Sequence, residues 1–130
     1  MQKAIKNVEL VKVVITSTGN AEFKLPQTPN IEGRQIVGIE TYKQSELPVT
    51  VDGLATLNDN ALLDAFISIN NGSKDVIQNL PLRKLVSSLN SGLLPAIEPT
   101  KVDAQKCTLK FGQTSHLYAG EVCLIVFYYE

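Results

Sequence analysis

Short runs of β-branched and other apolar residues, separated by Gly, Pro and Asn, recur along the chain and restrict its fold more than any other feature. In residues 107–111 apolar and polar positions alternate, whereas 121–129 are apolar at nearly every position. A period of two is typical of a strand with one face in water, and a continuous apolar run predicts a strand covered on both faces. Helical periodicity is scarce, so the pattern indicates an all-β domain.

The first two runs, 8–16 and 21–25, flank the polar residues 17–20. A tight polar turn between two apolar runs predicts a β-hairpin. In the first run the apolar phase slips between Leu10 and Val11. The slip indicates either a β-bulge or a strand that is buried on both faces.

A third strand is predicted over 35–42. A second hairpin follows it, because the Asn- and Gly-rich turn 70–73 joins the alternating run 65–69 to Val76 and Ile77.

Less regular segments connect these runs. Residues 47–51 are compatible with a short strand, and Asn58 with the cap of one or two helical turns that end near Leu63. Residues 80–89 fit either a strand or a short helix, whereas 90–100 fit a loop.

The size and composition are those of one globular domain: 130 residues, of which 44% are hydrophobic and 19% charged. The runs add up to about eight strands without a series of helices between them. We therefore predict a single all-β domain over 1–130. Its expected architecture is a two-sheet β-sandwich, in the form of one eight-stranded jelly roll with one or two short helical turns.

Several classes of function have no support in the sequence. The 12 Lys and Arg against 13 Asp and Glu give a net charge of −1, so no basic excess is present to bind nucleic acid. Phosphate-binding glycine patterns are absent. His116 is the only histidine, whereas metal enzymes with a β-barrel need several imidazoles. We expect no enzyme activity, no cofactor, no metal and no nucleic-acid contact.

Membrane insertion and export also lack a signal. No apolar stretch approaches the roughly 18 residues of a membrane-spanning helix. The first residues lack the apolar core of a signal peptide. We therefore expect no transmembrane segment and no export by that route.

The thiols and acidic residues leave alternatives open. Cys107 and Cys123, the only cysteines, lie in strand-like runs, which favours two buried thiols over a disulfide between neighbouring strands. A carboxylate pair for glycoside cleavage is spatial and is not excluded by the sequence. The candidates are Asp52, Asp59, Asp64 and Asp103.

Apolar residues are left over in segments that we expect at the surface. They are Leu93, Leu94 and Ile97 in the predicted loop, and Ile125, Phe127 and Tyr129 on the second face of the last strand. Because a monomer rarely exposes so much contiguous apolar surface, these residues are candidates for a subunit interface. The alternative is that the loop folds over one end of the sandwich as a plug.

The order of these segments resembles the small jelly-roll capsid, penton or vertex proteins of icosahedral bacteriophages. The segments that carry the resemblance are 35–40, 65–69 with its turn, 76–82, 107–111 and 122–129. The resemblance spans most of the chain from Gln35 onward and consists of spacing, without a diagnostic motif. The N-terminal segment departs from capsid proteins that have an Arg-rich arm for packaging the genome.

The resemblance implies a non-enzymatic structural protein located in the virion. Its partners would be copies of itself and other virion proteins. The alternative is a ligand-binding β-sandwich for carbohydrate recognition or adhesion, which the absence of Trp and the 6% aromatic content disfavour. A small hydrolase has the least support.

Overall fold

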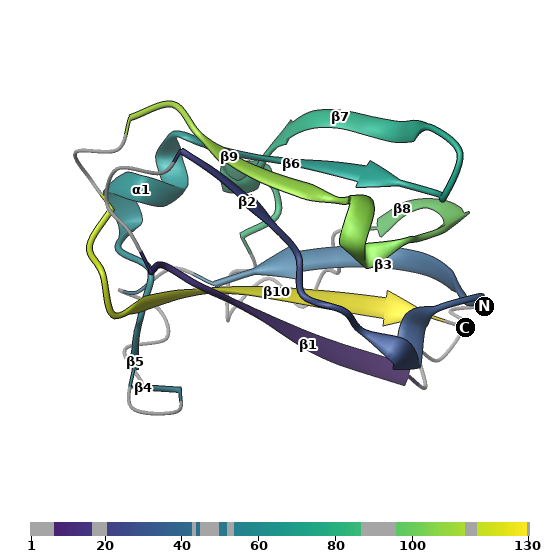
Figure 1. The fold of residues 1–130 in the computed structure, drawn as a ribbon, viewed down its shortest axis with the longest axis horizontal. Coiled ribbons are helices and arrows are strands. Elements are labelled where there is room, and N and C mark those ends of the chain that lie inside the picture. Colours follow the sequence, from purple (N-terminus) through teal and green to yellow (C-terminus); the bar gives the residue numbers. More distant parts are fainter. Residues whose placement is uncertain are drawn as a thin grey trace.

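The structure, a computed structural model, describes residues 7–16, 21–42, 44, 50–51, 54–86, 96–113 and 117–129. Within these residues two β-sheets form two layers, as Figure 1 shows. The prediction of an all-β, two-sheet sandwich is therefore confirmed. The described residues contain ten strands, where about eight were expected. The jelly-roll strand order stays a prediction.

The larger sheet has six strands arranged around β10 (Glu121–Tyr129). All of β1 (Asn7–Val14) pairs antiparallel with β10 and shows no register shift. Along its other side, β10 pairs antiparallel with β3 (Gln35–Thr41) and parallel with β5 (Leu54–Thr56). The sheet ends with β8 (Ala96–Lys101) beyond β3 and β4 (Thr50–Val51) beyond β5.

The smaller sheet has four strands in the order β2, β9, β6, β7. Their bounds are Glu22–Lys24, Thr108–Phe111, Ala65–Asn70 and Asp75–Pro81. The helical elements are α1 (Asp59–Leu63) and the 3-10 turns η1 (Pro29–Ile31), η2 (Leu82–Lys84) and η3 (Ala104–Lys106).

Two local predictions are confirmed by backbone and capping contacts. Strands β6 and β7 form the hairpin expected from the Asn-Gly turn. The Oδ1 atom of Asn58 accepts a hydrogen bond from the Ala61 amide at 3.0 Å, so Asn58 caps α1. In the described part of the segment 80–89, which is 80–86, strand β7 ends at Pro81 and a single 3-10 turn follows.

The prediction of a hairpin between 8–16 and 21–25 is wrong. Strand β1 belongs to the larger sheet and β2 to the smaller one, where β2 pairs with β9. The physical reason is burial, because Val11 and Phe23 contribute to one core from opposite layers, which two strands of a single sheet would not do.

The prediction of a loop over 90–100 is wrong for its last residues, because β8 begins at Ala96 and pairs antiparallel with β3. The misleading signal was Pro99, which interrupts the run. Proline is tolerated in this strand because β8 lies at the edge of the sheet.

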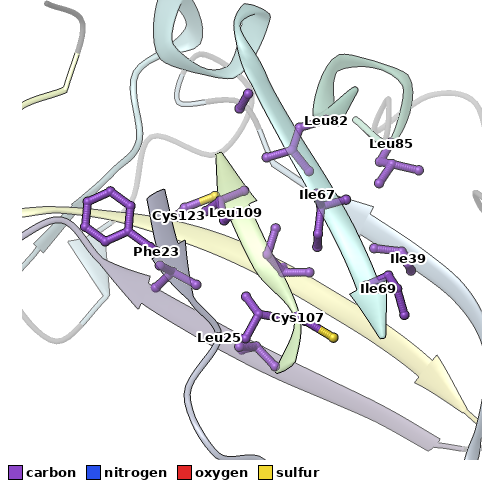
Figure 2. Packing of buried hydrophobic residues seen from close by; sticks show 14 of the residues in the cluster. Phe23, Leu25, Ile39, Ile67, Ile69, Leu82, Leu85, Cys107, Leu109 and Cys123 are labelled. Atoms are coloured by element: carbon purple, nitrogen blue, oxygen red, sulfur yellow. The ribbon is translucent and has the colours of Figure 1, made fainter. Parts of the chain in front are cut away.

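The core lies between the two sheets. Figure 2 shows side chains of both sheets in this core. Ile67, Ile69 and Leu109 come from the smaller sheet, and Ile39 and Cys123 from the larger sheet. The strand β10 is buried from Glu121 to Phe127, which confirms that its run is covered on both faces.

Candidate functional site

Two of the six residues predicted to form an interface lie inside the subunit. Ile125 and Phe127 are 0% exposed and belong to the core, so their assignment to an exposed face is wrong. The second face of β10 consists instead of Val122, Leu124 and Val126. Ile97 and Tyr129 are half-buried and pack against the same core, and Ile97 lies in β8 instead of a loop. Leu93 and Leu94 lie outside the described residues.

The described residues bring together no group of three His, Cys, Asp or Glu side chains that could hold a metal ion. His116 and Asp52 lie outside the described part of the chain. Asp64 directly precedes β6, whereas the Asp103 amide donates to the Asn70 carbonyl at the end of β6. These two carboxylates therefore lie at opposite ends of a strand and do not form a catalytic pair.

Both thiols are free and buried, as the favoured alternative predicted. Cys107 directly precedes β9 of the smaller sheet, where its Sγ atom donates to the Asp103 carbonyl at 3.2 Å. Cys123 lies in β10 of the larger sheet. Burial raises the pKa of Cys107 to about 11 and that of Cys123 to about 12, from an ordinary 9.0. Such thiols are poor nucleophiles at neutral pH.

The raised thiol pKa values predict a loss of stability at alkaline pH. Above pH 9 the thiols ionise in the unfolded chain but stay protonated in the folded chain, until the folded pKa of about 11 or 12 is reached. The free energy of unfolding should fall by about 1.4 kcal/mol per pH unit for each thiol. Urea unfolding between pH 8 and 11 should show a shallower decline for Cys123→Ala than for the wild type. Equal slopes for the two proteins would contradict the raised pKa of Cys123 in the folded chain.

The outer face of the larger sheet, which points away from the smaller sheet, bears an exposed apolar row on β1. Val8, Leu10 and Val14 are 54%, 43% and 40% exposed. Their partners across the β10 ladder are Tyr128, Val126 and Val122 in that order. The β1 row thus borders the apolar second face of β10, where Val122, Leu124 and Val126 are buried. We call Val8, Leu10 and Val14 the β1 apolar row.

The phase slip between Leu10 and Val11 was the sequence signal for this row, and both of its predicted explanations are wrong. The ladder between β1 and β10 is continuous, so β1 has no bulge. Burial on both faces fails because only the odd-numbered Val11, Val13 and Ile15 point into the core. The apolar residues at even positions are exposed.

Strand β1 is also the longest unbroken edge among the described strands. The edges β2 and β4 are three and two residues long. The edge β8 contains Pro99, and β7 is interrupted at Asn79, which has a φ of 52° and donates its amide to the Ser68 hydroxyl at 3.0 Å. Short strands, prolines and bulges all hinder the addition of another strand to an edge. None of these three features occurs in β1, whose charged residues are Glu9 and Lys12.

The hydrogen-bond pattern identifies which backbone groups of β1 face its open edge. The Ile15 amide donates to the Glu121 carbonyl at 2.9 Å, and the Ile15 carbonyl accepts from the Gly120 amide at 3.1 Å. Because the direction of N–H and C=O groups alternates along an antiparallel strand, the odd positions face β10. Val8, Leu10, Lys12 and Val14 therefore present their backbone groups to the open edge.

On the other side of β10, the outer face bears a buried carboxylate. Glu40 of β3 is 4% exposed and accepts a hydrogen bond of 2.7 Å from the Tyr128 hydroxyl. The Tyr42 hydroxyl is also affected by Glu40. Burial, together with the nearby Glu40, raises the pKa of both tyrosine hydroxyls above their ordinary value. The phenols thus stay protonated as donors, which compensates for the burial of the carboxylate.

Comparisons of the chain with protein-family models, curated proteins and solved structures gave no match. Among the described helices, none has the length and apolar character needed to cross a membrane. The candidate site is strand β1, where a sheet edge and the β1 apolar row coincide.

Proposed function

We propose that this protein is a non-enzymatic structural protein that assembles from copies of itself. The observation that supports this proposal is the β1 apolar row at an open sheet edge. Soluble monomers rarely expose contiguous apolar side chains, and a long edge strand without a proline or a bulge is a template for another chain. Both features occur on the same strand.

The charge of the chain favours self-association. With 12 basic and 13 acidic residues, the net charge is −1. Two copies therefore repel each other only weakly, in contrast to chains whose large net charge keeps them apart. Strand β1 contains one acidic and one basic residue, Glu9 and Lys12, so its own charge is balanced.

The assembly we propose is the shell of a virus, as a capsid, penton or vertex component. This part rests on the resemblance to the small jelly-roll proteins of icosahedral bacteriophages, and the two-sheet sandwich is compatible with it. The protein would be located in the virion and contact copies of itself and other virion proteins. The near-neutral charge supports no role in binding the genome.

Light scattering and electron microscopy of the purified chain test this proposal. At micromolar concentration we expect a homogeneous oligomer, and rings or closed particles would support a shell component. Leu10→Ser should weaken the association roughly tenfold, because it removes the centre of the apolar row. Leu63→Ser is the matched control, since Leu63 is 57% exposed on α1. A monomer at all concentrations would overturn the proposal.

A further inference from the structure

We infer that two copies join by antiparallel pairing of their β1 strands across a two-fold axis, so that the two larger sheets become one. This inference rests on the proposed self-assembly and specifies its contact. The partner of β1 is the same strand of a second copy. Among the described edge strands, β1 is the one that is long and has neither a proline nor a bulge.

The backbone supplies the first part of the argument. The edge-facing N–H and C=O groups belong to the same even positions, Val8 to Val14, whose side chains form the outer face. Pairing with a second β1 would add the alternating hydrogen bonds of an antiparallel ladder along this edge. The inner ladder between β1 and β10 would remain unchanged.

The two-fold axis restricts the register. An axis perpendicular to the sheet keeps the outer faces of both copies on one side, so even positions must pair with even positions. The β1 apolar rows of the two copies would then be adjacent. The joined outer face would be wider than that of either copy alone.

The charges of β1 select among the remaining registers. Centring the pair on Glu9 or on Lys12 would place identical charges directly opposite, which is destabilising. Centring it on Leu10 would place the two Glu9 carboxylates diagonally on the inner face. There Glu9 is half-buried and accepts a hydrogen bond from the Asn30 amide group at 3.2 Å.

Centring the pair on Val11 avoids these contacts and, unlike centring it on Val13, pairs most of β1. The two Lys12 side chains then lie diagonally on the exposed outer face and not directly opposite each other. In this register Val8 pairs with Val14 of the second copy, and Leu10 pairs with Lys12. The Lys12 stem would cover the exposed Leu10 side chain.

Cysteine cross-linking tests the register. We expect a disulfide between copies when Val8→Cys and Val14→Cys proteins are mixed and oxidised with oxidised glutathione, but none with either protein alone. The native Cys107 and Cys123 are buried and should not react in the folded protein. Self-cross-linking of Leu10→Cys, without the mixed product, would overturn the Val11-centred register.

A proline substitution tests the edge itself. Leu10→Pro removes an edge-facing N–H but no hydrogen bond to β10, so the fold should persist while association falls at least tenfold more than in Leu10→Ala. Where the wild type assembles but shows neither the mixed cross-link nor the proline effect, this inference fails and the proposed function stands. A wild type that stays monomeric overturns both.

Discussion

Phe127→Ala should lower the free energy of unfolding by about 3–5 kcal/mol. The Phe127 side chain is 0% exposed and lies on β10, the strand around which the larger sheet is built. Its neighbours on the two adjacent strands are Glu9 and Ile39. Truncation to alanine would leave a cavity that the paired strands cannot close without losing their register. Urea unfolding followed by circular dichroism measures the loss.

The concentration dependence separates a core role of Phe127 from an interface role. A core residue should give the same loss at every protein concentration, because the cavity forms within one subunit. Val8→Ala is the control on the exposed face, and should change the unfolding free energy of the subunit by less than about 1 kcal/mol. A loss at Phe127 that disappears on dilution would restore its assignment to an interface.

Tyr128→Phe should cost about 1.5–3 kcal/mol, which is the range for a hydrogen bond to a charged group. The substitution removes the 2.7 Å bond to Glu40 and leaves the ring in place. Glu40 is buried, so water does not readily replace the lost donor. Chemical denaturation at pH 7 gives the difference.

Two further variants isolate the bond to Glu40. Tyr129→Phe is the matched control, because the neighbouring Tyr129 hydroxyl has no hydrogen bond to a described residue and its removal should cost little. Glu40→Gln completes a double-mutant cycle, in which the coupling between positions 40 and 128 should exceed about 1 kcal/mol. Additive effects would show that the bond contributes nothing beyond packing.

The fold was predictable where local pattern and tertiary role agree. The alternation in 107–111 and the continuous apolar run of 121–129 predicted the burial of β9 and β10. The Asn-Gly turn predicted the β6–β7 hairpin, since the turn alone determines which strands are neighbours. The prediction of a β1–β2 hairpin was wrong because the sequence does not reveal where a chain crosses from one sheet to the other.

The candidate site was harder to predict, because exposure depends on neighbours that are distant in sequence. Phe127 and Leu10 are both apolar residues in strands, yet one is buried between two sheets and the other lies on an edge strand. Likewise, no local signal pairs Glu40 with Tyr128, which meet only because β3 and β10 are adjacent. The slip of the apolar phase between Leu10 and Val11 pointed to β1, but it did not show that β1 lies at the edge of its sheet.

The position of β10 in the chain affects how the protein forms during synthesis. Strands β1, β3 and β5 all pair with a strand that leaves the ribosome after them. Until it emerges, the nascent chain holds three strands without their common partner, and no part of the larger sheet around β10 can close. The larger sheet therefore cannot form around β10 before this strand has been made, and until then the waiting strands are exposed to chaperones and to other nascent chains.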